Sequence, residues 1–335
     1  MARQPETLLY AKSHEWVDVA QEGDAVAVDN QIASLFSAMR FGDALLSCTE
    51  QSGDYRFLDE GRCGWLSIGG QRFEQDATGD NLGFDVDSWQ IAGGGQFALD
   101  NGWHVGGALA YERRNLSVRD SRASSDGSQI QAGVSAKRRF GATELSGSFA
   151  LGYGDFDIDR DPLPGVLLGG SQRMWLASGQ LRAAHLIERG RWTLIPRIDL
   201  GIDYLSMEGF REAGDGGLAL RVDAADDIYV HLQPAIDIGA EFKPEAGVLI
   251  RPRLSLGVTQ FLGDAAPTAT GRFAAAPGDV EPFTARTDLD RTRFDVAAGL
   301  DIFTRNKMVL RAEASASLSQ NSECYAGGLN IEIRF

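Results

Sequence analysis

The chain has 335 residues, with 40 glycines, only 10 prolines and a net charge of −15 at pH 7. That charge argues against a nucleic-acid-binding protein, which would carry a basic surface. Hydrophobic residues make up 43% of the chain, yet no stretch approaches the ~18 consecutive apolar residues of a transmembrane helix. A membrane β-barrel is still compatible with this composition, because its lipid-facing residues alternate with polar ones.

The first 28 residues differ in pattern from the rest. Met1–Thr7 lacks the basic start and the apolar run of a signal peptide. Because an exported protein needs such a peptide, we expect the chain to be incomplete or to carry a foreign start. Residues 1–20, through the stretch Leu8–Val17, resemble the N-terminus of the glycine-cleavage H protein, but no lipoate-bearing lysine segment follows. We therefore infer no lipoyl function and interpret residues 1–28 as an atypical segment, produced by a fusion or a gene-model junction or similar to that family by chance.

Residues 29–60 are predicted to be a linker that contains a helix. Asp29 or Asn30 could cap a helix over residues 31–47. Four of its apolar residues share one face at helical spacing, namely Ile32, Leu35, Phe36 and Met39.

Three cysteines are too few for a disulfide scaffold, and they lack the spacing of metal ligands. Cys48 and Cys63 could close one small loop in an oxidising compartment. They could equally be unpaired small apolar residues, as could Cys324, so both interpretations stay open.

From about Gly64 to the C-terminus, apolar and polar residues alternate with period two, which indicates β-strands with one apolar face. The alternation predicts twelve strands, near residues 64–73, 89–99, 103–111, 130–135, 145–153, 175–182, 192–204, 228–242, 248–259, 293–302, 308–318 and 328–335. In the last strand the apolar face consists of Leu329, Ile331, Ile333 and Phe335.

The connections between these strands are of two kinds. Tight turns are predicted near Asp100–Gly102, Phe140–Gly141, Glu188–Gly190, Lys243–Ala246 and Arg305–Asn306. Between them lie long polar stretches, near residues 74–87, 115–128, 155–172, 207–226 and 262–291. Because short and long connections alternate, all tight turns lie at one end, as in bacterial outer-membrane barrels. We therefore predict an all-β fold, a 12-stranded antiparallel transmembrane barrel at residues 61–335, preceded by the N-terminal helix; the resemblance described below implies that this helix lies in the lumen of the barrel.

The strand faces predict which side chains meet lipid and which meet the lumen. Trp192 and Tyr204 lie twelve residues apart on one face, which at ~3.3 Å per residue and a 45° tilt is roughly 28 Å across the membrane. We expect them in the two aromatic girdles. The charged residues on the opposite faces are predicted to line the lumen: Arg182, Arg197, Asp199, Arg251, Arg253, Asp295 and Arg311.

Three stretches carry a resemblance to the β-domain of autotransporters, the type V secretion proteins. They are Asp87–Gly95, Gly102–Tyr111 and Gly328–Phe335. The resemblance implies a bacterial outer-membrane translocator that exports or anchors its own N-terminal passenger, with the helix in the pore. No passenger precedes the helix in this sequence, so we expect either that the passenger is absent because it was removed or that the protein is a barrel without cargo. The resemblance also implies membrane lipid and the barrel-assembly machinery as partners, the latter recognising Leu329, Ile331, Ile333 and Phe335.

Chemistry of other kinds finds little support in the sequence. None of His14, His104, His185 and His231 has metal-ligand spacing, and we expect no cofactor and no enzymatic activity. His231 near Asp237 is compatible with an outer-membrane hydrolase, which we weigh against the translocator. A passive porin-like channel and a soluble adhesive β-protein are also compatible with the sequence.

Overall fold

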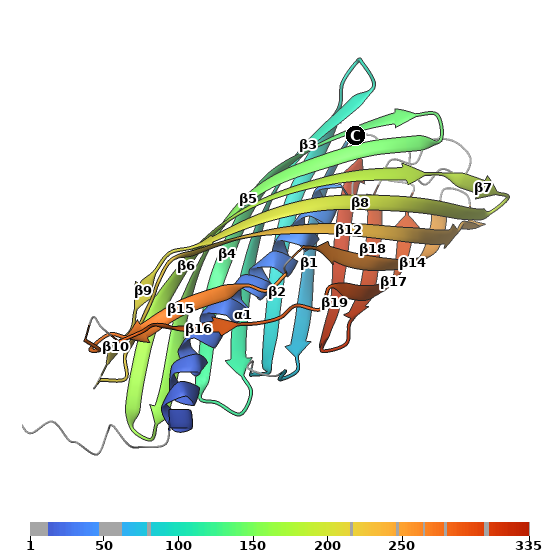
Figure 1. Cartoon of the computed structure of the whole chain (residues 1–335). Helices are drawn as coiled ribbons and strands as arrows, with labels where there is room; N and C mark the ends of the chain where they lie inside the picture. The colour runs from blue at the N-terminus through green and yellow to red at the C-terminus, as the bar shows by residue number, and fades with distance from the viewer. Residues whose placement is uncertain are drawn as a thin grey trace, which may run out of the picture.

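A computed structural model describes residues 13–46, 62–78, 82–214, 217–245, 248–263, 265–277, 280–304 and 308–334, with side chains from Ala25 onward. The helix α1 (Ser13–Leu45) runs through the inside of an antiparallel β-barrel (Figure 1). This helix is not apolar enough to cross a bilayer as a membrane span.

Twelve strands form the barrel wall, each paired antiparallel with its neighbours. They are β1 (Cys63–Gln75), β2 (Phe84–Ala98), β3 (Trp103–Val118), β4 (Ala123–Phe140), β5 (Thr143–Leu163), β6 (Val166–His185), β8 (Trp192–Met207), β12 (Ala225–Ala240), β14 (Val248–Leu262), β17 (Thr292–Phe303), β18 (Met308–Leu318) and β19 (Ser322–Arg334). Short strands β7 (Ile187–Arg189), β10 (Ala213–Gly214) and β13 (Phe242–Glu245) extend this sheet.

The barrel is closed between its first and last strands. Pairing of β1 with β19 runs from Cys63 opposite Arg334 to Gln75 opposite Ser322. An open strand edge would leave backbone N–H and C=O groups unpaired in lipid, so closure is what a membrane barrel requires. The prediction of a closed 12-stranded barrel with an internal helix is confirmed.

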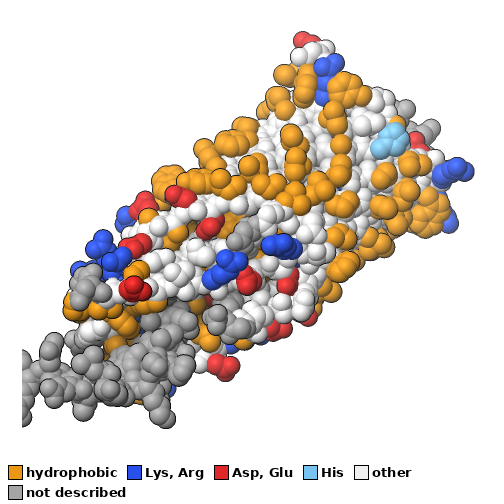
Figure 2. Space-filling model, in the orientation of Figure 1, with side chains coloured by type: hydrophobic (Ala, Val, Ile, Leu, Met, Phe, Trp, Pro, Cys, Tyr) orange, Lys and Arg blue, Asp and Glu red, His pale blue; other side chains and the backbone are white. Residues whose placement is uncertain are grey.

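The alternation in the sequence separates the two faces of the wall. Leu200 is 44% exposed and Leu329 is 61% exposed, whereas the adjacent Asp199 is fully buried. Figure 2 shows apolar side chains covering the surface near the tight turns, with charged side chains gathered over β15 and β16 at the other end. In water this apolar surface would be costly, but in a bilayer the lipid tails cover it.

Two of the predicted long loops are strands instead. The sequence predicts loops at residues 115–128 and 155–172, but β3 and β4 continue to Val118 and Ala123, and β5 and β6 continue to Leu163 and Val166. The inner faces of these extensions pack against α1, while their outer faces meet water and are polar. Such strands have a weaker apolar signal, which is why their sequence resembles that of loops. The connection predicted at 74–87 is also shorter, because β1 ends at Gln75 and β2 begins at Phe84.

The other two long connections fold into a second, four-stranded sheet. It consists of β9 (Phe210–Arg211), β11 (Leu220–Val222), β15 (Thr268–Phe273) and β16 (Phe283–Arg286), in the order β16-β15-β11-β9. This outer sheet lies against α1 at the end of the barrel away from the tight turns (Figure 1). The loops therefore help to bury the helix.

The helix begins earlier than predicted. It starts at Ser13, so Asp29 and Asn30 lie within it and do not cap it. The predicted start depends on the onset of an apolar face. In the structure, however, Asp29, Asn30 and Gln31 are all buried, so the helix has no solvent-facing side here to mark its periodicity.

Candidate functional site: the occupied lumen

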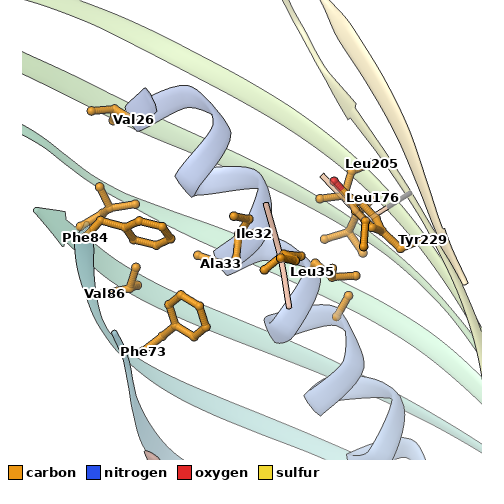
Figure 3. Packing of buried hydrophobic residues seen from close by; sticks show 14 of the residues in the cluster. Val26, Ile32, Ala33, Leu35, Phe73, Phe84, Val86, Leu176, Leu205 and Tyr229 are labelled. Atoms are coloured by element: carbon orange, nitrogen blue, oxygen red, sulfur yellow. The ribbon is translucent and has the colours of Figure 1, made fainter. Parts of the chain in front are cut away.

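The lumen is partly filled by α1, which packs along one wall of the barrel. That wall consists mainly of β3, β4, β5 and β6. Ile32 and Leu35 lie in an apolar cluster with Phe73, Phe84 and Leu176 from the wall (Figure 3). Phe36 and Met39, the other two residues of the predicted face, pack against the same cluster. The helix is therefore held by a true core inside the barrel.

Polar residues of the helix are matched by polar residues of the wall. The Asn30 amide donates to Ser125 Oγ at 3.0 Å and to Gln172 Oε1 at 2.9 Å. Further along the helix, Ser37 Oγ donates to Glu112 at 2.6 Å and accepts from the Gln131 amide at 3.0 Å. Because buried polar groups without partners are costly, this pairing favours one position of the helix in the lumen.

Beside these contacts lies a buried ion pair that the sequence patterns did not single out. Arg114 Nη2 lies 2.8 Å from Glu112 Oε1, and both side chains are almost fully buried. Arg114 also donates to Ser34 Oγ at 3.0 Å and to the carbonyl of Asn30 at 3.3 Å. The alternation of the third strand, continued past Tyr111, would have placed Glu112 and Arg114 in the lumen.

Cations of the wall meet the C-terminal end of the helix. Buried Lys137 donates to the carbonyl of Leu46 at 2.9 Å, where the partial negative charge of the helix dipole lies. Arg182 binds Asp43 at 2.6 Å. Both contacts fix the end of α1 that leads towards β1.

The outer sheet holds the opposite half of α1. Ala27 and Val28 share an apolar cluster with residues of β11, β15 and β16. Thr287 donates to Asp29 Oδ1 at 3.1 Å. The outer sheet is tied to the wall through Arg160 of β5, which lies 2.6 Å from Glu212, with both side chains buried. The helix is thus enclosed between the wall and the outer sheet.

On the other side of α1 the lumen keeps a polar cavity of about 550 Å³. It lies between the C-terminal half of the helix and a wall formed mainly by β1, β14, β17, β18 and β19, with residues of β6, β8 and β12. Of the residues predicted to line the lumen, those that border this cavity are Arg182, Arg197, Arg251, Arg253, Asp295 and Arg311. Asp199 lies beneath them, bonded to Arg182 at 2.5 Å and to Arg197.

The predicted lumen arginines are paired with acidic residues. Arg253 lies 2.5 Å from Glu313, and Arg311 lies 3.1 Å from Glu332. Arg251 pairs with Glu241. The structure thus brings the predicted arginines together with acids from neighbouring strands, which makes the cavity polar without a large excess of one charge.

The predicted neighbour of His231 is wrong. Asp237 lies six residues along the same strand, at about 20 Å by the strand rise, and pairs with Arg197 at 3.3 Å. The carboxylate beside His231 is Asp203 on the adjacent strand, whose Oδ2 lies 3.3 Å from Nδ1. Among the described residues, no group of three His, Cys, Asp or Glu side chains is arranged to hold a metal ion.

Aromatic side chains mark two levels of the outer surface. Tyr204 is at the same end of the wall as two ring pairs, Tyr153–Trp175 at 4.8 Å and Trp89–Tyr111 at 5.7 Å between centroids. Trp192 lies at the other level, next to the tight turn between β7 and β8.

The remaining predicted residues are placed as follows. Leu329, Ile331 and Ile333 of β19 face outward, and Phe335 lies outside the described residues. Cys63 is disulfide-bonded and Cys324 is free; Cys48 lies outside the described residues.

Comparison with known proteins supports the same architecture. No curated protein matches the chain. The structure is similar to the translocator domain of the autotransporter NalP from Neisseria meningitidis, with a TM-score of 0.75 and 15% identity over 92% of this chain and 99% of that one. It is also similar to the β-domain of the Bordetella autotransporter BrkA, with a TM-score of 0.62 and 16% identity over 82% of this chain and 100% of that one.

A third similar structure is the transport unit of the autotransporter AIDA-I from Escherichia coli, with a TM-score of 0.55 and 13% identity over 94% of this chain and 99% of that one. At these identities the likeness shows the fold. The sequence model of the autotransporter β-domain family matches residues 64–321, which is most of the chain. The chain therefore belongs to the autotransporter β-domain family and is a translocator barrel of the bacterial outer membrane.

Proposed function

We propose that this barrel carries to the cell surface the polypeptide segment joined to the N-terminal end of α1, and that α1 then stays in the pore. The observation that carries the proposal is the course of α1. It enters the lumen beside the outer sheet and ends beside Trp65 and Cys63, at the start of β1. A chain that runs through the barrel in this way has its N-terminal end on the side of the long connections.

Orientation follows from the connections. In outer-membrane barrels the short turns face the periplasm and the long connections face outside. The tight turns, with Gly102, Gly141 and Gly190 at positive φ, lie at the end where α1 ends. The N-terminal end of α1 therefore faces the exterior.

Assembly would use the last strand. We propose that the barrel-assembly machinery recognises β19, whose outward face carries Leu329, Ile331 and Ile333, by adding a strand to an exposed edge before closure with β1. Lipid of the outer membrane then surrounds the apolar band. This role needs no catalytic step, so we propose that the chain is not an enzyme.

A second candidate function is passive conduction of small solutes. The cavity of about 550 Å³ beside α1 favours this function, because its arginines and acids could replace part of the hydration shell of a passing ion. Because α1 packs in the lumen, small solutes could pass only through the cavity that remains beside the helix.

A surface-display experiment tests the proposed function. An epitope is placed before Ser13, the chain is expressed with a signal peptide, and intact cells are treated with a non-permeant protease. We expect the epitope to be cleaved in intact cells, and not in a matched Leu200→Arg variant whose barrel assembles poorly. Cleavage only after the outer membrane is opened would contradict the proposal.

A further inference from the structure

Two arginines at the tight-turn end lie beside pairs of aromatic rings. The Arg138 guanidinium carbon lies 5.5 Å from the ring centroid of Trp103 and 5.1 Å from that of Phe140. On another part of the rim, the corresponding atom of Arg191 lies 5.7 Å from Trp192 and 5.3 Å from Phe242. Two separate places on the barrel therefore have the same composition of one arginine and two aromatic residues.

Both clusters lie on the outside of the barrel at the edge of the apolar band. Lys137 points into the lumen and binds the end of α1, so Arg138 projects from the opposite face of β4, with the exposed Val134 and Phe140. Arg191 is exposed and precedes Trp192, which is also exposed. Figure 2 shows Lys and Arg side chains beside apolar ones at the end of the barrel where β7 lies.

These arginines differ from three exposed or half-buried arginines near the hairpin between β3 and β4, at the opposite end of the barrel. There, Arg113 pairs with Asp126 at 3.0 Å, Arg119 with Asp85 at 2.6 Å and Arg122 with Asp161 at 3.0 Å. Within the described part of the chain, neither Arg138 nor Arg191 pairs with a carboxylate. Both guanidinium groups can therefore bind an anion that the protein itself does not supply.

The position of the clusters identifies that anion. Aromatic side chains at the border of an apolar band lie at the level of the lipid headgroups. A guanidinium next to an aromatic ring keeps N–H donors at its edge, and these can bind a phosphate with two hydrogen bonds. The rings stabilise the cation through their faces and provide a surface for the adjoining glycerol and acyl carbons.

We propose that Arg138 with Trp103 and Phe140, and Arg191 with Trp192 and Phe242, are two binding sites for the phosphate of anionic phospholipids in the leaflet next to the tight turns. The proposal requires the barrel to lie in a bilayer and is independent of the export of a passenger. The two sites would fix the depth and tilt of the barrel in the membrane.

The test measures lipid preference of the folded, full-length barrel. The protein is reconstituted in vesicles of phosphatidylcholine that contain equal small fractions of brominated phosphatidylglycerol or brominated phosphatidylcholine, and tryptophan quenching is compared. Because a cation at the headgroup level contributes about fivefold in lipid affinity, we expect the native protein to favour phosphatidylglycerol severalfold. Replacing both arginines, Arg138→Gln with Arg191→Gln, should abolish the preference.

Three controls make the result specific. The variant Arg113→Gln at the opposite end should keep the preference, and Arg138→Lys with Arg191→Lys should keep part of it, since the charge is retained but the two hydrogen bonds of the guanidinium are lost. Inorganic phosphate at the concentration of the brominated lipid should not reduce it. Heat-modifiable migration on a gel confirms that each variant is folded. An unchanged preference in the double Gln variant, an equal loss in Arg113→Gln, or displacement by inorganic phosphate would overturn the proposal.

Discussion

At the scale of single residues, the direction of each side chain could be predicted, but its partner could not. Alternation was sufficient to place Leu200 outside and Asp199 inside. It could not show that Asp199 binds Arg182 on the neighbouring strand, because the register between strands depends on the whole sheet. Ile195, an apolar residue on the otherwise polar face predicted for residues 192–204, is explained only by the structure, where it packs against Ala184 and Leu186.

A pair of substitutions at similar depth tests this side-chain sorting. Leu200→Arg places a cation in lipid, which costs ~2–4 kcal/mol near the midplane. Gln233→Arg is the matched control, because Gln233 lies opposite Asp199 on the next strand and donates to Asp295 at 2.9 Å, an acid that arginine can also bind. We expect Leu200→Arg to lower the folded fraction in a urea titration followed by heat-modifiable migration, and Gln233→Arg to change it little. Equal losses would show that the faces are wrongly assigned.

At the scale of elements, the sequence was informative inside the membrane and poor outside it. The membrane-spanning parts of the strands have an apolar side that faces lipid, and this side produces the alternation of apolar and polar residues in their sequence. The extensions of β3 to β6 lack such a side, so their sequence predicts loops. The strands of the outer sheet are only two to six residues long, and β11 pairs with β15 far along the chain, so no local pattern marks them.

The buried pair between Arg160 and Glu212 should decide whether the outer sheet stays attached to the wall. Removing one partner of a buried ion pair costs ~3–5 kcal/mol, because the other charge stays unpaired. We therefore expect Glu212→Ala to speed trypsin cleavage of the folded protein at Arg211 and Arg221, which lie in β9 and β11.

Two further variants separate this effect from a general loss of stability. Replacing both partners, Arg160→Leu with Glu212→Leu, should restore most of the resistance, since no buried charge remains. Glu208 lies in the same connection as Glu212, and Glu208→Ala removes only its exposed ion pair with Arg173 of β6. This variant should have little effect. Cleavage as slow in Glu212→Ala as in the native protein would show that the pair does not hold the outer sheet.

At the scale of the whole molecule, the barrel and its helix form one packed unit. The wall alone would enclose a polar channel, and α1 fills it through an apolar cluster, hydrogen bonds to polar wall residues and contacts with the outer sheet. The presence of the helix and its place in the lumen could be predicted from the sequence. Its length and its tight fit could not, because Asp29, Asn30 and Gln31 are buried within the helix and leave no solvent-facing polar side there to mark its periodicity.

Single-channel conductance in planar bilayers tests most directly whether α1 closes the pore. The full chain is compared with a chain that lacks residues 1–46, after gel migration shows that both barrels are folded. We predict small, rare current steps for the full chain and large, long-lived steps for the shortened chain, which a peptide of residues 13–46 should reduce. Equal conductance of the two chains, with no effect of the peptide, would contradict the account.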